Sequence, residues 1–544
     1  MQLGDKWSDV GEAIDNAMRR RAAALFILYS IVFFLWTGFL AHLRLLWFDE
    51  FITLYVIRFH SLAELVQKLK TGMELNPPLF HLLTRVSTSL FGESAIALRL
   101  PAMIGFWIMT VCTYVFVQRR TSPLFGAVAA LFTLATTSYL YAFEARPYGI
   151  VLGCCGISMV AWQSATDGRN RRIALLALTA SLATAVSCHY YAGLLALPLV
   201  AGELVRTESR RRLDIPVWVA MIAGVSSVFI YLPLIRAGFK VHNNEHVWNK
   251  PQISFSWESY WTLLGYVCIP FVAALAFLWW KRLQESRGNT PSDTQVPFPE
   301  IVASSVLAGL PIIALAAASS ITNMITERYV VSAILGSAIL FSFTCWKIGN
   351  NRISFGFGTL LLLIVFFAIG QVRKVESLLA LRNYYSSPAL NATLASKDVP
   401  IVVKGLDSMP FQYYAAEEFR SRAVAVVDFE RMYRFSSVDT VDRLLVLGQG
   451  TFPIKVRDYQ GFRRENPHFL IFGGPVGWIE DAVIAEGGTV RVAYWDKEHP
   501  TVIFAADCNR SAAQTSGTQS AANSPEAEDG GANADNRQQA IRVR

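Results

Sequence analysis

Charged residues are scarce in this chain of 544 residues. Asp, Glu, Lys and Arg make up 17% of it, whereas hydrophobic residues make up 53%. Soluble globular proteins contain roughly 25% charged residues, and the mean hydropathy of +0.35 points the same way. The shortage of charge argues against a wholly soluble enzyme, a coiled coil and a disordered protein. The remaining class is a polytopic α-helical membrane protein.

Cysteine patterns that would indicate a disulfide framework or a zinc site are also absent. All seven Cys except Cys508 lie in apolar runs, where we interpret them as small buried hydrophobic residues. The sequence has no CxxC motif and no His/Cys cluster. It also lacks a credible nucleotide phosphate loop and an internal repeat. We therefore expect no metal site and no bound nucleotide.

Long apolar runs occupy most of residues 22–372. A spanning helix needs about 20 apolar residues, and about eleven segments approach that length. The first follows Arg19-Arg20-Arg21 and has no small-residue cleavage site, so we expect an uncleaved helix rather than a signal peptide. The expected spans are 22–42, 95–117, 124–142, 147–165, 173–188, 190–205, 214–235, 259–280, 300–319, 328–346 and 353–372.

The distribution of Lys and Arg between the short loops predicts the orientation. With residues 1–21 placed in the cytoplasm, the inside segments hold 18 Lys and Arg in 67 residues, and the outside segments hold 9 in 89. Positive residues accumulate on the cytoplasmic side of inner-membrane proteins. We therefore expect a multi-pass plasma (inner) membrane protein with a cytoplasmic N-terminus. The net charge of +8 is explained by orientation and needs no nucleic-acid partner.

The composition changes after the last expected span. Residues 373–510 carry 17 Lys and Arg against 17 Asp and Glu, and short β-rich runs alternate with helix-like pieces. This pattern predicts a C-terminal α/β domain, and an odd number of spans would place it outside the cytoplasm. Residues 511–544 are rich in Ser, Ala, Gly, Asn and Gln without periodicity, which predicts a disordered tail.

The first outside loop, residues 43–94, carries an unusual pair of acidic residues. The segment Trp47-Phe48-Asp49-Glu50-Phe51 puts two carboxylates just beyond the outer end of the first span. Acidic residues at membrane depth are costly and tend to be functional, and such a carboxylate is suited to act as a general base on a substrate at the membrane surface. The competing interpretation is a polar flank that simply ends a helix.

The same loop continues with Met73-Glu74-Leu75-Asn76-Pro77-Pro78-Leu79. The two prolines impose an extended entry, and the apolar run from Leu79 to Phe91 is too short to span. We expect a re-entrant or interfacial helix with Glu74 at its start. Phe91-Gly92-Glu93 and Arg99-Leu100-Pro101 then lead into the second span, where we expect a structural role for Arg99.

Together these segments resemble the protein O-mannosyltransferase family and its bacterial relatives that use lipid-linked sugars, including the aminoarabinose and galacturonic acid transferases. The resemblance rests on Asp49-Glu50, on the Met-acid-x-(His/Asn)-Pro-Pro-Leu segment and on the Phe-Gly-Glu…Arg-Leu-Pro segment. Glu327-Arg328-Tyr329 is similar to an Arg-Tyr element late in these chains. The resemblance implies a GT-C-like membrane domain over residues 22–372. Asn76 departs from the His usual in the mannosyltransferases.

The resemblance also implies a reaction, in which a sugar moves from a polyprenyl-phosphate donor to an extracytoplasmic protein, lipid or envelope-glycan acceptor, with inversion. Asp49 would be the base that takes the acceptor proton, and Glu50 would support it or shape the acceptor site. Glu74 and Asn76 would contact sugar or acceptor. The donor is already activated, so no cofactor is required. A divalent metal on Asp49 and Glu50 is left open, although the resemblance argues against needing one.

Cations for the leaving phosphate are expected on the same face. Arg328, at the outer end of the tenth span and followed by Tyr329, is the first candidate because a guanidinium binds two phosphate oxygens. The alternative is a snorkelling arginine at the interface, with its charged head in water. Arg146, in the short loop with Glu144, is the second candidate. Its alternative is an ordinary pair with Glu144, although i and i+2 positions do not face each other on a helix.

Two further points concern the possible role of His189 and an alternative function of the protein. His189 lies between the fifth and sixth expected spans and would contact sugar or phosphate, unless it is structural, as a lone interfacial histidine more often is. A transporter or flippase of a lipid-linked sugar is the alternative function. Transporters tend to carry mid-membrane charges and internal repeats, which we do not detect here. The expected partners are the lipid-linked donor, an acceptor and membrane lipids.

Overall fold

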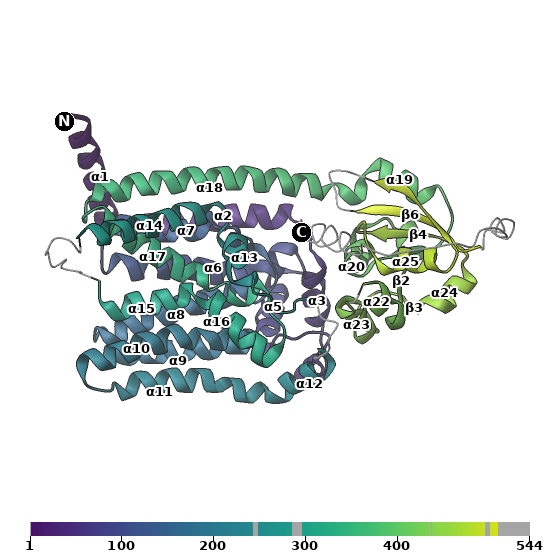
Figure 1. Cartoon of the computed structure of the whole chain (residues 1–544), viewed down its shortest axis with the longest axis horizontal. Coiled ribbons are helices and arrows are strands. Elements are labelled where there is room, and N and C mark those ends of the chain that lie inside the picture. The colour runs from purple at the N-terminus through teal and green to yellow at the C-terminus, as the bar shows by residue number, and fades with distance from the viewer. Residues whose placement is uncertain (1, 243–247, 286–295, 437, 496–500, 510–544) are drawn as a thin grey trace, which may run out of the picture.

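A helical bundle and a smaller α/β unit make up the part of the chain that the structure describes (Figure 1). This computed structural model describes residues 2–242, 248–285, 296–436, 438–495 and 501–509, so the expected tail 511–544 lies outside the described residues. The long helices of the bundle run side by side, and the α/β unit lies at one end of them. We call that end of the bundle the sheet-side end.

The bundle contains α-helices with short 3-10 and π-helical segments between them. Its first half comprises α1 Gln2–Arg20, α2 Ala22–Leu43, α3 Phe48–Val56, α4 Leu62–Lys70, α5 Pro78–Phe91, α6 Ala95–Gln118, α7 Pro123–Ala135, η1 Thr137–Phe143, α8 Tyr148–Thr166, α9 Arg171–Cys188, η2 Tyr190–Leu195 and α10 Ala196–Arg210. Its second half comprises α11 Ile215–Val225, η3 Ser226–Tyr231, α12 Leu232–His242, α13 Phe255–Leu264, η4 Gly265–Val267, α14 Cys268–Glu285, α15 Phe298–Ala308, α16 Leu310–Ala317, η5 Ala318–Thr322, η6 Glu327–Val330, α17 Ala333–Ile348 and α18 Ile353–Arg382.

The eleven expected spans are all helical, but they do not all have spanning length. Among the described residues, 7 helices are long and apolar enough to cross a membrane, or up to 9 if each of two bent pairs is one span. The bent pairs are α7 with η1, at 80°, and α15 with α16, at 56°. The two segments that fall short form α10, with 15 residues, and α17, with 16 residues.

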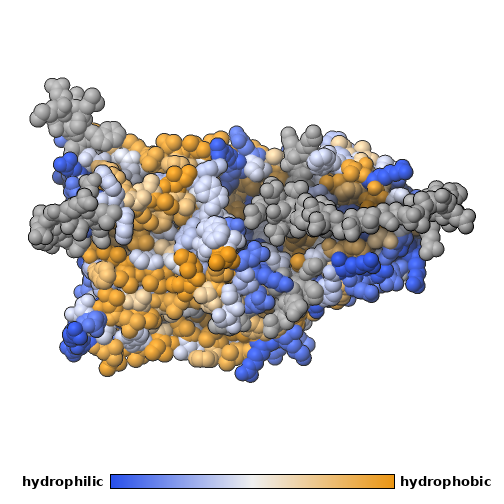
Figure 2. Space-filling view, in the orientation of Figure 1, coloured by the Kyte–Doolittle hydropathy of each residue, from blue (hydrophilic) through white to orange (hydrophobic). Residues whose placement is uncertain are grey.

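The outer surface of the bundle is apolar over most of its length. Large hydrophobic side chains on the peripheral helices are exposed, among them Leu35, Leu176 and Ile230. Figure 2 shows this apolar surface between hydrophilic ends. Exposed apolar area of this extent is rare on soluble monomers. The structure thus confirms a polytopic helical membrane protein.

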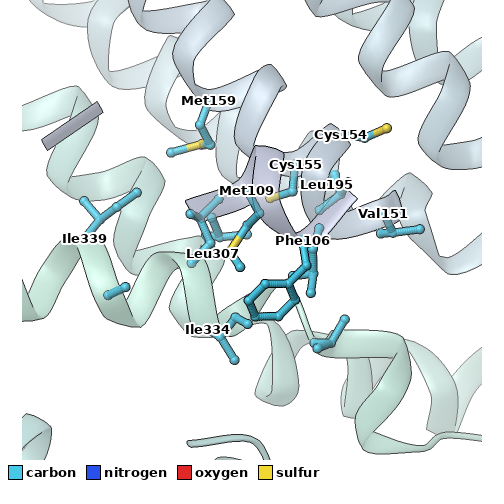
Figure 3. Close-up of a cluster of buried hydrophobic side chains, with 14 of the residues drawn as sticks. Phe106, Met109, Val151, Cys154, Cys155, Met159, Leu195, Leu307, Ile334 and Ile339 are labelled. Atoms are coloured by element: carbon cyan, nitrogen blue, oxygen red, sulfur yellow. The ribbon is translucent and has the colours of Figure 1, made fainter. Parts of the chain in front are cut away.

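The close packing of α6 against α8 fixes the loop that precedes α8. A Cβ atom added at Gly105 would lie 2.3 Å from the Gly149 carbonyl oxygen, and one added at Gly149 would lie 2.4 Å from the Ala102 carbonyl oxygen. Small residues let two membrane helices approach at backbone distance. Buried side chains of α6, α8 and α17 then form the core shown in Figure 3, with Phe106 and Met109 on α6.

A six-stranded mixed sheet organises the α/β unit, with strand order β3-β2-β1-β4-β6-β5. β1 pairs in parallel with β2 and β4, and β2 with β3, whereas β6 is antiparallel to β4 and β5. The strands are β1 Ile401–Val403, β2 Ala423–Val427, β3 Val456–Asp458, β4 His468–Gly473, β5 Thr489–Trp495 and β6 Val502–Asp507. The helical elements are η7 Tyr384–Ser386, α19 Pro388–Ala395, α20 Gly405–Tyr414, α21 Glu417–Arg422, α22 Phe429–Phe435, α23 Thr440–Leu447, α24 Tyr459–Glu465 and α25 Trp478–Ala485.

The α/β unit is joined to the bundle through α3. The phenol of Tyr414, at the end of α20, accepts a hydrogen bond from the Leu46 N–H at 2.7 Å. The Phe51 ring lies 5.1 Å from the Tyr413 ring and 6.0 Å from the Tyr414 ring. The short helix that carries the two predicted acidic residues therefore lies between the bundle and the sheet.

Candidate active site

Asp49 and Glu50 lie in the first turn of α3, just after the chain leaves α2. Trp47 precedes the helix in an extended conformation, and its N–H donates to Glu50 Oε2 at 3.3 Å. The N-terminal dipole of a helix favours carboxylates in this turn. Successive residues on a helix point about 100° apart, so the two carboxylates face different surroundings. Glu50 is fully buried, whereas the Asp49 side chain is 20% exposed.

A buried ion pair between Glu50 and Arg99 anchors α3. Arg99 donates through Nε and Nη2 to the two Glu50 oxygens, each at 2.7 Å, and Glu50 Oε1 also accepts from the Ala145 N–H at 2.7 Å. Burial opposes the charge of Glu50, but the Arg99 guanidinium keeps the pKa of this carboxyl below its usual value. Arg99 also donates to three carbonyl oxygens at the end of α2, those of Ala41, Arg44 and Leu45. Arg99 thus ties α3 to the end of α2 through Glu50, which agrees with a structural role for Arg99.

A second buried pair joins the Pro-Pro segment to the loop before α8. Arg146 Nη1 donates to Glu74 Oε2 at 2.7 Å and to the Asp49 carbonyl oxygen at 3.3 Å. Asn76 donates to Glu74 Oε1 through its side-chain Nδ2 at 2.7 Å. Burial would raise the pKa of Glu74, but the Arg146 guanidinium, His81 and the hydrogen bond from the Asn76 N–H together outweigh it, and the pKa falls to about 2. Glu74 is therefore a carboxylate, and Arg146 pairs with it rather than with Glu144.

Asp49 and Arg328 form a further ion pair, which is partly exposed, unlike the two buried pairs. Arg328 Nη1 lies 2.5 Å from Asp49 Oδ2, and the two side chains are 23% and 20% exposed. The Arg328 guanidinium also lies over the Trp47 ring, 4.9 Å from its centroid, a favourable cation–π position. Burial opposes the charge of Arg328, but Asp49 raises the pKa of its guanidinium above the usual value. A carboxylate and a guanidinium, both partly exposed, therefore lie in contact at this end of the bundle.

Aromatic rings line the site next to Arg328. Tyr329 stacks on Tyr191 with ring centroids 4.3 Å apart, and the Tyr191 phenol donates to the Met324 carbonyl. The buried His189 ring lies 5.2 Å from Tyr329 and 5.4 Å from Tyr148. Burial is the main reason that the pKa of His189 falls to about 3. His189 is therefore a neutral part of an aromatic wall.

Glu144, directly after η1, pairs with Arg44. Its Oε2 accepts from Arg44 Nη2 at 3.2 Å, and its buried Oε1 has no hydrogen-bond partner within the described ranges. Burial raises the pKa of Glu144 above its usual value. The backbone carbonyl of Glu144 accepts from the Arg146 N–H at 2.7 Å, which turns the loop so that the two side chains diverge.

The structure gathers the predicted site residues at the sheet-side end of the bundle. Asp49, Glu50 and the Glu74–Arg146 pair are linked through α3, and Arg328 reaches them from η6. The residues not expected from the sequence are Arg44, Trp47, His81, Tyr148 and Tyr191. Within the described ranges no three His, Cys, Asp or Glu side chains are grouped to hold a metal ion.

Comparisons with known proteins give one family match and two similar solved structures. Residues 76–235 match the model of the dolichyl-phosphate-mannose-protein mannosyltransferase family. The structure is similar to that of ArnT from Cupriavidus metallidurans in the apo state, with a TM-score of 0.53 and 16% identity over 90% of this chain and 98% of that chain. The same ArnT bound to undecaprenyl phosphate gives a TM-score of 0.51 and 16% identity, over 89% of this chain and 98% of that chain.

No curated protein sequence matches the chain. The fold is that of ArnT, and the two kinds of match confirm the resemblance to the GT-C membrane glycosyltransferases.

Proposed function

We propose that this protein transfers a sugar from a polyprenyl-phosphate donor to an acceptor hydroxyl or amine at the membrane surface. The observation that carries the proposal is the accessible pair of Asp49 and Arg328, which lies beside the buried Glu74–Arg146 pair. A transferase of this kind needs a base for the acceptor and a cation for the leaving phosphate. The fold shared with ArnT, one structure of which contains undecaprenyl phosphate, supports a lipid-linked donor.

The chemistry follows from the charges of the two residues. Asp49 accepts the acceptor proton while the acceptor atom bonds to the anomeric carbon of the sugar. The bond from that carbon to the phosphate oxygen breaks, and the lipid phosphate leaves with the electron pair. Arg328 stabilises the developing negative charge, since a guanidinium fork matches two phosphate oxygens. Attack from the face opposite the phosphate inverts the anomeric centre.

The buried pairs hold this geometry without taking part in bond changes. Glu50 with Arg99 and Glu74 with Arg146 fix α3 from two directions. Arg146 Nε is buried and has no hydrogen-bond partner in the part of the chain that the structure describes. We assign this N–H to a sugar or phosphate oxygen, with His189 and Tyr329 forming the wall beside it.

The membrane side follows from the charge of the loops. The sheet-side end carries the loops with sparse Lys and Arg, which the positive-inside rule places away from the cytoplasm. We place the site and the α/β unit on the extracytoplasmic side of a plasma membrane. The acceptor is then a protein, lipid or glycan of the cell envelope.

The test is transfer by the purified protein from radiolabelled polyprenyl-phosphate sugars to envelope lipids, glycans and proteins. We expect Asp49→Asn to reduce the rate by at least about 100-fold, because general-base catalysis typically contributes 10²–10⁴. Glu376→Gln is the matched control, since Glu376 is an exposed carboxylate on α18. Full activity of Asp49→Asn would contradict the assignment of Asp49 as the general base. Lipid movement across liposomes without a glycosylated product would favour transport instead.

A further inference from the structure

A cavity lies where the end of α2, the start of α6 and the ends of α18 and α20 meet. Its volume is about 240 Å³. Its lining includes His42, Arg44, Arg58, Glu93 and Arg382. None of these residues belongs to the proposed catalytic pair, so the cavity is a separate feature.

The charges that face this cavity are unbalanced. Arg58 donates to both oxygens of Glu93, at 3.3 and 2.7 Å, and Arg44 pairs with Glu144. No carboxylate contact is found for Arg382 among the described residues; its Nη2 lies 3.1 Å from the His42 Nε2, and both residues are exposed. A guanidinium bonded only to an imidazole leaves a full positive charge at the cavity, which is the usual condition for anion binding.

The start of α6 adds a second source of positive potential. Ser94 and Ala95 line the same cavity, and Ser94 is the N-cap of the 24-residue helix α6, where its Oγ accepts from the Ala97 N–H. The other N–H groups of such a first turn have no partner within the helix and favour an anion. Tyr413 also lines the cavity and supplies a phenol. Arg382 and the α6 N-terminus therefore face one small volume from two elements.

The position of the cavity relative to the apolar surface indicates a lipid as the source of the anion. Arg382 and His42 end α18 and α2, which are both candidate spans that lie next to each other (Figure 1). Exposed apolar side chains precede them by less than one turn, namely Phe39 on α2 and Leu379 and Leu381 on α18. A phospholipid whose acyl chains lie along these side chains has its phosphate at the height of the cavity.

We propose that this cavity binds the phosphate of an anionic phospholipid, with Arg382, His42 and the N-terminus of α6 as its contacts. The bound lipid would link the bundle to the α/β unit, because Tyr413 and Tyr414 line the cavity and also contact Phe51 on α3. This site is independent of the proposed glycosyl transfer, because it shares none of the catalytic residues.

The experiment measures lipid binding to the purified full chain in mild detergent. Phosphatidylglycerol, phosphatidylcholine and inorganic phosphate are titrated separately, and the readouts are bound lipid in native mass spectrometry and the melting temperature. We expect phosphatidylglycerol to bind and stabilise the wild type, and Arg382→Gln to weaken that binding at least fivefold. Arg352→Gln is the matched control, an exposed arginine at the other end of α18.

A second variant separates loss of the site from loss of the fold. His42→Glu gives Arg382 a carboxylate within the chain, so we expect it to abolish phosphatidylglycerol binding while the melting temperature without lipid is kept. The proposal is overturned if Arg382→Gln and His42→Glu bind phosphatidylglycerol like the wild type, or if Arg352→Gln loses it equally. Equal stabilisation by inorganic phosphate or phosphatidylcholine would overturn the assignment to an anionic lipid.

Discussion

Arg328 Nη1 lies 2.5 Å from Asp49 Oδ2, although 279 positions separate the two residues in the chain. Asp49 comes from the first loop and Arg328 from η6, just before α17. The proposed base and the proposed phosphate cation are therefore brought together by the fold of the whole bundle. The contact also makes the roles of the two residues separable by experiment.

The first prediction concerns Arg328. We expect Arg328→Gln to lower transfer by about 100- to 1,000-fold, the loss typical for one donor that stabilises a developing anion. Donor binding should weaken as well, because the phosphate loses its cation. Arg328→Lys should recover only part of the rate, since an ammonium lacks the fork. Single-turnover rates and donor titrations measure the two effects, and an unchanged donor affinity in Arg328→Gln would contradict the assignment.

The second prediction uses the buried histidine of α5. His81 is fully buried, neither ring nitrogen has a hydrogen-bond partner among the described residues, and burial lowers its pKa from 6.5 to about 4. The unfolded chain therefore binds a proton that the folded protein does not, between these two pH values. Stability should fall as the pH drops through this window, by at most about 1.4 kcal/mol per pH unit.

Replacement of this histidine tests that dependence. His81→Leu should flatten the fall in melting temperature between pH 6.5 and pH 4, because the group that takes up the proton is gone. The control is His60→Leu, since the His60 side chain is 95% exposed and its loss should leave the slope in place. An identical slope in His81→Leu and the wild type would mean that other groups control the acid sensitivity.

The third prediction concerns the contact between α6 and α8. Gly149→Ala places a methyl group 2.4 Å from the Ala102 carbonyl oxygen, so the helices must separate. We expect a loss of about 1–3 kcal/mol of stability and a lower rate of transfer, since Arg146 lies directly before α8. Gly358→Ala is the matched control, because a Cβ there meets nothing within 4 Å. Thermal unfolding in detergent compares the two variants.

The fourth prediction tests the junction of the α/β unit with α3. Tyr414→Phe removes the acceptor of the Leu46 N–H and keeps the ring contact with Phe51. We expect a loss of roughly 1 kcal/mol, the usual value of one such hydrogen bond, and faster hydrogen exchange at residues 46–51. Unchanged exchange in this segment would show that the junction does not hold α3.

The sequence predicts the class of fold well, because the class depends on local patterns. The apolar runs identify the helical segments, and the resemblance identifies residues such as Asp49, Arg146 and Arg328. The fold and the resemblance are confirmed by the similarity to ArnT and by the family match. The roles of the individual residues stay predictions.

The pairing of charges could not be predicted in the same way. Arg146 pairs with Glu74, 72 positions away, rather than with the nearby Glu144, because the loop before α8 turns the two side chains apart. Glu50 is buried, whereas the Asp49 side chain is partly exposed. Only the packing of α3 decides which of these two adjacent carboxylates is exposed. The lengths of the individual helices could not be predicted either, because composition does not reveal where a short helix such as α17 ends.

The contacts of α3 come from distant parts of the chain, and this separation affects the order in which they form during biosynthesis. A ribosome releases Asp49 early, but Arg328 and Tyr414 follow only after most of the polypeptide has been made and inserted. Until then Asp49 lacks its ion partner Arg328, and α3 lacks the surface of the α/β unit against which it packs. A nascent or truncated chain therefore has the acidic loop without these two contacts, and α3 reaches its final surroundings only late in synthesis.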